Sequence, residues 1–245
     1  MGLSAERERI AEIRLPPVLS AATIHVLAHN LATALAGPGR VVVFTGADGI
    51  FCHGLDLASV GADGGTAMAA FVDFLIELSK AAKPTLALID GTAMGGGLGI
   101  LSACDVALAT DRSRFGLPEA LYGFLPAAIF PVLLERLSMQ KVNLLIVNGA
   151  SQDALWAFSH GLIDDVVSAD SIVPCSRRWA RRLERTSLSV AIPELRRLCR
   201  QNRALNLEDS IRRGAAQTLA ALSDPDRAER IRRFVTEGLA PWEVQ

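Results

Sequence analysis

The sequence lacks the features of a membrane protein and of a disulfide-stabilised protein. None of its apolar runs reaches the eighteen or so residues that are needed to span a bilayer. Its four cysteines show no C-x-x-C spacing, so neither a disulfide framework nor a zinc site is expected. We therefore expect a cytoplasmic protein with no membrane contact and no metal ion.

An excess of charge of one sign is also lacking, with 25 basic and 26 acidic residues and a net charge of −1. The distribution is nevertheless uneven, because residues 171–245 carry fifteen arginines against nine acidic residues. Aromatic residues make up only 5% of the chain and do not interleave with these arginines, so nucleic acid is not an expected partner. The surplus indicates either a solvated helical face or a docking surface for an acidic partner.

Half of the 245 residues are apolar, which is enough to build a sizeable core. Strand-like runs at Val41–Thr45 and Thr85–Ile89 alternate with helical periodicity over Ala67–Ala82 and Pro131–Val147. Ser20 is expected to cap an additional helix. Strands that alternate with helices in this way predict an α/β fold with a parallel core.

The strand pattern stops near residue 170, and only Arg-rich helical segments follow. We therefore predict two parts. Residues 1–170 form the core that holds the site, and residues 171–245 form a C-terminal helical region.

Four glycines fall within five positions after the Thr85–Ile89 run, at Gly95, Gly96, Gly97 and Gly99. A second apolar segment, Ile100–Leu108, follows at once, so the glycines are expected where a strand gives way to a helix. Glycine lets backbone N–H groups approach a ligand, and a helix N-terminus favours developing negative charge. Taken alone, the same glycines would equally fit a tight structural turn.

A carboxylate, Glu119, follows twenty residues after the last of these glycines, on a Pro-Glu turn. A dinucleotide site would need its acidic residue at the tip of the next strand, but Glu119 follows a loop-like Phe-Gly-Leu-Pro sequence. Nicotinamide binding is therefore not expected. An anion-stabilising backbone with one acid/base group is the minimum that enolate chemistry requires.

Together with the upstream segment Phe51–Leu57, these residues resemble the signature of the crotonase (enoyl-CoA hydratase/isomerase) family. The resemblance implies a ββα spiral core, with an oxyanion hole formed by the backbone amides of Leu55 and Gly96. Gly95 and Asp56 would complete the acyl-thioester site, where Asp56 chiefly fixes the turn. The resemblance also implies a homotrimer or a dimer of trimers. No cofactor is expected beyond the phosphopantetheine or coenzyme A that carries the substrate.

Hydratases of this family use two glutamates, but here Gly99 stands at the position of the first and only Glu119 is kept. Two subfamilies share this pattern: Δ3,Δ2-enoyl-CoA isomerases, and the dehydratase of polyketide β-branching. The latter removes water from a 3-hydroxy-3-methylglutaryl group on an acyl carrier protein. Three stretches resemble it more closely: residues 96–109, Leu117–Ala127, and Arg233–Gln245 with its Pro-Trp-Glu sequence. We adopt the dehydratase (a lyase) as the interpretation. An isomerase, another acyl-CoA enzyme and a non-catalytic acyl-thioester-binding scaffold are the alternatives.

The resemblance also implies roles for individual residues. Glu119 would take the α-proton. His53 would bind a distal carboxylate or assist the departing hydroxyl, and Tyr122 would orient Glu119, although each could equally have only a structural part. An acidic carrier protein would be attracted by the C-terminal arginines. The candidate contacts are Arg177, Arg178, Arg181 and Arg182.

Overall fold

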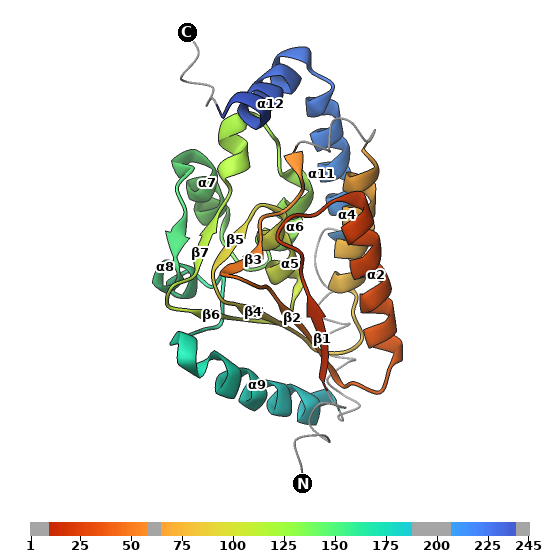
Figure 1. Ribbon diagram of the computed structural model, residues 1–245, viewed down its shortest axis with the longest axis vertical. Helices are drawn as coiled ribbons and strands as arrows, with labels where there is room; N and C mark the ends of the chain where they lie inside the picture. The colour runs from red at the N-terminus through yellow and green to blue at the C-terminus, as the bar shows by residue number, and fades with distance from the viewer. Residues whose placement is uncertain (1–9, 58–64, 188–206, 239–245) are drawn as a thin grey trace.

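A five-stranded parallel sheet forms the base of the fold (Figure 1). The computed structural model describes residues 10–57, 65–187 and 207–238, so the C-terminal Pro-Trp-Glu sequence at 241–243 lies outside the described residues. The strands of this sheet, in spatial order, are β1 (Ile10–Arg14), β2 (Val41–Thr45), β4 (Thr85–Ile89), β6 (Val106–Thr110) and β9 (Asp165–Val167).

A second sheet of four short strands lies above the first in the view of Figure 1, and only its last strand is antiparallel. Its strands, in spatial order, are β3 (Ile50–Cys52), β5 (Thr92–Met94), β7 (Arg114–Gly116) and β8 (Gln152–Asp153).

From β2 to β7, successive strands along the chain alternate between the two sheets. Each of β2, β4 and β6 in the first sheet is followed directly by a strand of the second sheet, and a helix follows the first two such pairs. These helices are α4 (Thr66–Ser79) and α5 (Gly96–Ala103). The repeated strand–strand–helix unit confirms the predicted α/β fold with a ββα spiral core.

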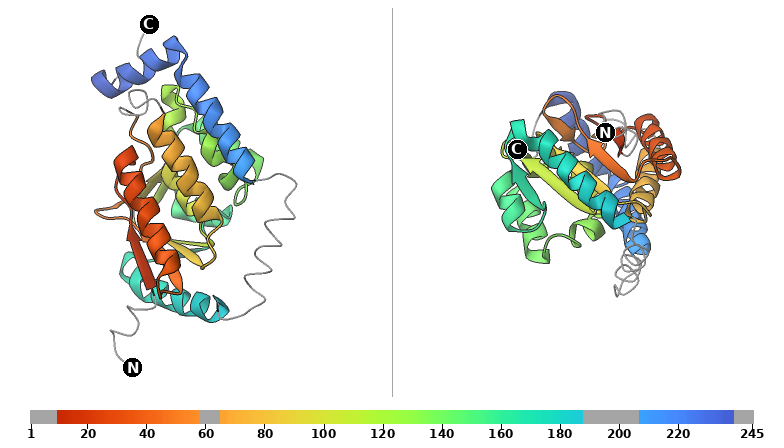
Figure 2. Two further views of the ribbon diagram at one scale, coloured as in Figure 1. Left: turned by 90° about the vertical axis from the view of Figure 1, so that its right-hand side faces the viewer. Right: turned by 90° about the horizontal axis from the view of Figure 1, so that it is seen from below.

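The helix predicted after Ser20 is α2 (Ala21–Ala36). The Ser20 hydroxyl accepts a hydrogen bond from the Thr23 N–H at 3.3 Å, and the Thr23 hydroxyl accepts one from the Ser20 N–H at 2.8 Å. This reciprocal cap satisfies two N–H groups that would otherwise lack partners at the helix start. Helices α2 and α4 lie side by side on one flank of the molecule (Figures 1 and 2).

The prediction of one helix over Pro131–Val147 is wrong, because two helices occupy this stretch: α6 (Phe130–Leu133) and α7 (Met139–Asn148). Arg136 lies between them and donates a hydrogen bond to the Asp164 carboxylate at 3.0 Å, as well as to two backbone carbonyls. These bonds tie the connecting turn to neighbouring segments, so the chain leaves the helical path there.

The apolar run Ile100–Leu108 was expected to begin a helix, but only its first part is helical. Helix α5 ends at Ala103, and β6 starts three residues later. Asp105 marks the corner, since its carboxylate accepts hydrogen bonds from the N–H of Thr85 at 2.8 Å and from the Thr85 hydroxyl at 3.0 Å. Both halves of the run are buried, so hydrophobicity alone could not show the boundary.

Three helices make up the described part of residues 171–245, and none of those described residues is in a strand. They are α9 (Ile172–Ser187), α11 (Leu207–Leu222) and α12 (Pro225–Glu237). Helices α9 and α12 lie at opposite ends of the molecule (Figures 1 and 2). Within the described ranges, no helix is both long enough and apolar enough for a bilayer crossing. The division of the chain at residue 170 stays a prediction.

Helix α11 is fastened to a short 3-10 helix, η2 (Ala127–Ile129), by a close backbone approach. A Cβ atom on Gly214 would lie only 2.2 Å from the carbonyl oxygen of Ala127. One turn further along α11, the Thr218 hydroxyl donates a hydrogen bond to the Leu125 carbonyl at 2.6 Å.

We expect Gly214→Ala to lower the free energy of unfolding by about 1–3 kcal/mol, because the added methyl group collides with backbone. This loss should appear although alanine favours helix formation over glycine. Gln217→Ala, on the exposed side of the same helix, should change it by no more than about 0.5 kcal/mol. Thermal or denaturant unfolding measures both variants, and equal stability of the two would contradict the packing argument.

Candidate active site

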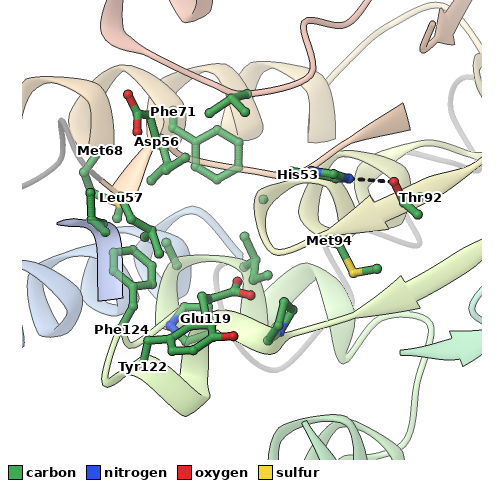
Figure 3. A pocket seen from close by; sticks show the side chains of 18 residues that line it. His53, Asp56, Leu57, Met68, Phe71, Thr92, Met94, Glu119, Tyr122 and Phe124 are labelled. Atoms are coloured by element: carbon green, nitrogen blue, oxygen red, sulfur yellow. Dashed lines mark hydrogen bonds between the residues drawn. The ribbon is translucent and has the colours of Figure 1, made fainter. Parts of the chain in front are cut away.

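A cavity of about 530 Å³ lies between the glycine turn, helix α4 and the segment that follows β7 (Figure 3). Most of its lining is apolar. Six of the seven predicted site residues line it, and the seventh, Gly95, lies directly behind Glu119. The six are His53, Leu55, Asp56, Gly96, Glu119 and Tyr122.

The glycine turn is bonded to the strand that leads to Glu119. Gly95 has φ 50° and ψ −119°, and its N–H donates to the Gly116 carbonyl at 3.1 Å. A Cβ atom on Gly95 would lie 2.5 Å from Oε1 of Glu119. Glycine is therefore required here both by the backbone conformation and by the carboxylate that covers the turn.

At the cavity wall, two backbone N–H groups lie without an acceptor among the described residues. The Leu19 N–H donates to the Gly54 carbonyl at 2.8 Å, and the Asp56 N–H donates to the Leu19 carbonyl at 2.9 Å. These bonds leave the N–H of Leu55 directed away from residue 19. Within the described residues, neither the Leu55 N–H nor the Gly96 N–H donates a hydrogen bond.

The two turns that carry these N–H groups are in backbone contact. Gly54 has φ 83°, and a Cβ atom on it would lie 2.4 Å from the nitrogen of Gly96. Helix α5 begins at Gly96, so its N-terminal dipole points to the same place. This arrangement can stabilise a negatively charged oxygen.

Glu119 lies in the 3-10 helix η1 (Pro118–Tyr122) and is only 9% exposed. Burial raises the pKa of its carboxyl to about 7, against a smaller lowering effect of a hydrogen bond from its own backbone N–H. The Phe124 N–H donates to the Glu119 carbonyl at 3.2 Å, which closes the turn. A carboxyl group with such a pKa can both accept and return a proton near neutral pH.

His53 lies on a different wall of the cavity from Glu119 (Figure 3). Its Nε2 is 2.6 Å from the hydroxyl oxygen of Thr92, and burial lowers the pKa of the imidazole. Tyr122 lies three residues after Glu119 in η1, so both side chains project from the same turn.

The cavity also contains residues that the sequence analysis did not single out. Among them are Met68 and Phe71 of α4, Thr92 of β5, and Ile129 of η2. Met68, Phe71 and Ile129 are at most 3% exposed, so their apolar pattern could not be told from that of ordinary core residues. No signal in the sequence separated them.

The four arginines named as candidate contacts for a carrier protein do not line the cavity. They belong to α9, which packs on β2, β4 and β6 through buried residues such as Cys175. From the C-terminal helices, the cavity lining instead includes Val235 of α12, which lies at the opposite end of the molecule from α9 (Figure 1). The charge pattern located the arginines on a helix but could not show which face of the sheet that helix covers.

Comparisons with known proteins agree with this geometry. The family model for enoyl-CoA hydratase/isomerase matches residues 7–245. The chain is 29% identical over 221 residues to the bacillaene synthase dehydratase PksH of Bacillus subtilis, covering 84% of this chain and 80% of PksH. It is 32% identical over 194 residues to the "Probable enoyl-CoA hydratase echA8" of Mycobacterium tuberculosis, covering 76% and 75%.

The solved structure of PksH aligns with a TM-score of 0.81 at 24% identity, covering 95% of each chain, which shows the shared fold. The match to larger relatives is partial, because the chain spans only 24% of the length of the peroxisomal multifunctional protein MFP2 of Arabidopsis thaliana.

Proposed function

Because the chain belongs to the enoyl-CoA hydratase/isomerase (crotonase) family, we propose that it dehydrates a 3-hydroxy-3-methylglutaryl thioester to the 3-methylglutaconyl thioester in polyketide β-branching. The observation that carries the proposal is a buried carboxylate, Glu119, in an apolar cavity beside two N–H groups that have no acceptor among the described residues. The similarity to a dehydratase over most of both chains supports the reaction type.

The proposed reaction uses these groups in two steps. The thioester carbonyl accepts hydrogen bonds from the N–H groups of Leu55 and Gly96, each typically worth about 3 kcal/mol in the transition state. Glu119 takes the α-proton, and the electron pair of the broken C–H bond forms the enolate. That pair then forms the α,β double bond as the β-hydroxyl leaves with the proton from Glu119, so one water is released.

We propose an acyl carrier protein as the natural donor, with phosphopantetheine as the arm that enters the cavity. Coenzyme A carries the same arm and would serve as a substitute. No further cofactor is needed, because the reaction changes no oxidation state. The homotrimer or dimer of trimers stays a prediction.

The direct test is incubation with 3-hydroxy-3-methylglutaryl carrier protein, followed by intact mass measurement. We expect a loss of water, with faster turnover than for the same acyl group on coenzyme A. Loss of carbon dioxide would point to decarboxylation, and an unchanged mass would overturn the dehydratase. Migration of the double bond in a 3-enoyl-CoA without such a loss of water would favour the isomerase.

A second prediction concerns His53, which lines the cavity across from Glu119. If it binds the distal carboxylate, His53→Ala should raise KM for the glutaryl substrate by about tenfold and leave KM for a butyryl analogue unchanged. His53→Gln keeps a hydrogen-bond donor and should restore part of the affinity. An equal effect on both substrates would leave His53 with only a structural part.

The pKa of Glu119 also predicts how activity depends on pH. The base must be ionised, so kcat/KM should rise with pH and level off above about 7. A kcat/KM that is flat from pH 5 to pH 9 would contradict Glu119 as the base.

The ionisation of Glu119 that raises kcat/KM with pH lowers the free energy of unfolding over the same pH range. The pKa is about 7 when folded and about 4.5 when unfolded, so the folded state binds the proton more tightly. Stability from this group is therefore present below pH 4.5 and is lost as pH rises through 7. Relative to Glu119→Gln, the wild type should lose up to about 3 kcal/mol of unfolding free energy across that range.

A further inference from the structure

The first turn of helix α5 and the cap before it are covered by two different chemical groups. The Gly99 N–H donates to the carbonyl of the cap residue Gly95 at 3.4 Å, so the two positions lie one turn apart. Oε1 of Glu119 lies 2.5 Å from the Cβ position of Gly95, and Cγ2 of Ile129 lies 2.6 Å from that of Gly99. A carboxylate therefore covers one end of this segment, and an alkyl group covers the other.

Phe71 makes the wall between these two ends apolar. Its Cζ atom lies 3.2 Å from the Cβ position of Gly96 and 3.7 Å from that of Gly99. The apolar surface thus starts beside the Gly96 N–H and continues to Ile129, which is 3% exposed and lines the cavity. A thioester whose carbonyl is held at Gly96 has its β-carbon two bonds further along this surface.

A water molecule would be poorly held at the Gly99 end of this segment. Buried water needs two to four polar partners, and the three heavy atoms nearest to the Cβ position of Gly99 are carbons of Ile129 and Phe71. An alkyl substituent on the β-carbon, in contrast, would gain contact with both.

Backbone contacts position the segment that carries Ile129. It ends η2, which packs against α11 through the close approach at Gly214 and the Thr218–Leu125 hydrogen bond. A wall fixed by backbone contacts can discriminate between substituents that differ by one carbon.

We propose that Ile129 is a specificity-determining residue that receives the alkyl branch on the β-carbon of the substrate. This inference rests on the proposed function, because it takes the reacting thioester to be anchored at Leu55 and Gly96. In this proposal, Ile129 fills the space that the side chain of a second acidic residue at position 99 would otherwise occupy.

The test compares three carrier-bound 3-hydroxyglutaryl substrates that carry hydrogen, methyl or ethyl as the second substituent on carbon 3. The wild type should prefer methyl to hydrogen and to ethyl, each by about tenfold or more in kcat/KM. Ile129→Ala should shift the ethyl-to-methyl ratio by at least about tenfold toward ethyl, a gain that misfolding cannot produce. Ile129→Val should shift it less and in the same direction.

Ile163→Ala is the matched control, because Ile163 is 1% exposed and does not line the cavity. It should keep the wild-type order of the three substrates. The inference is overturned if Ile129→Ala leaves the ethyl-to-methyl ratio of kcat/KM at the wild-type value.

A second measurement separates this inference from the proposed function. The wild type should hydrate crotonyl-CoA poorly, and so should Gly99→Glu, whose side chain collides with Ile129. The pair Gly99→Glu with Ile129→Ala should hydrate it at least about tenfold faster than either single variant.

If the wild type removes no water from any of the three carrier substrates, the proposed function is wrong, and the crotonyl-CoA result still decides the part played by Ile129. Equal hydration by Gly99→Glu alone and by the pair would show that Ile129 does not fill this space.

Discussion

Replacing Glu119 with glutamine is expected to lower kcat/KM by at least about a hundredfold while the protein remains folded. Loss of a positioned acid/base group typically costs a factor of about 10² to 10⁴. The amide has nearly the same shape as the carboxylate and is uncharged, so it should fit the buried site without further rearrangement. Circular dichroism and the unfolding temperature check the fold, and steady-state kinetics check the activity.

Asp56→Asn is the matched control, since Asp56 is the other acidic residue of the cavity lining. It should retain most of the activity, because Asp56 is assigned to the turn and not to the proton transfer. Near-normal turnover in Glu119→Gln, or a larger loss in Asp56→Asn, would show that Glu119 is not the base.

The second large effect is expected from Gly54→Ala, which displaces the N–H donors of Leu55 and Gly96 relative to each other. The added methyl group would lie 2.4 Å from the nitrogen of Gly96, so the two turns must separate. Displacing one such donor typically costs a factor of about 10² to 10³ in kcat. We therefore expect kcat to fall by at least about a hundredfold, with a smaller change in KM.

Gly49→Ala distinguishes lost donors from backbone strain. Gly49 also has a positive φ, 75°, but among the described residues no heavy atom beyond its chain neighbours lies within 4 Å of the position that its Cβ would take. Both variants carry the strain of an alanine at positive φ, yet only Gly54→Ala should lose turnover. Equal kinetic losses in the two variants would remove the support for an oxyanion hole at this position.

The parts of the fold that the sequence predicted well have strong local signals. The runs Val41–Thr45 and Thr85–Ile89 coincide with β2 and β4, because each is a buried apolar or β-branched segment bounded by turn residues. The strands of the second sheet could not be located in the sequence, since β3, β5 and β7 have only three residues each. So short a strand shows no measurable periodicity.

The residues of the candidate site likewise fall into those that a local sequence pattern predicts and those that it does not. Leu55, Gly96 and Glu119 could be predicted because turns and a Pro-Glu pair leave a recognisable pattern. Ile129 could not, because its importance comes from a contact with Gly99 across thirty positions of the chain. The location of α9 could not be predicted either, because charge composition does not show on which side of a sheet a helix lies.

The cavity wall is completed by α12, the last of the described elements along the chain. Val235 lines the cavity and Ile231 is buried in the core, yet both follow Glu119 by a long stretch of sequence. Because a ribosome makes the chain from the N-terminus, the base and the glycine turn emerge well before this helix. During synthesis the part of the cavity wall that Val235 contributes is therefore formed last among these groups, once α12 has emerged and docked.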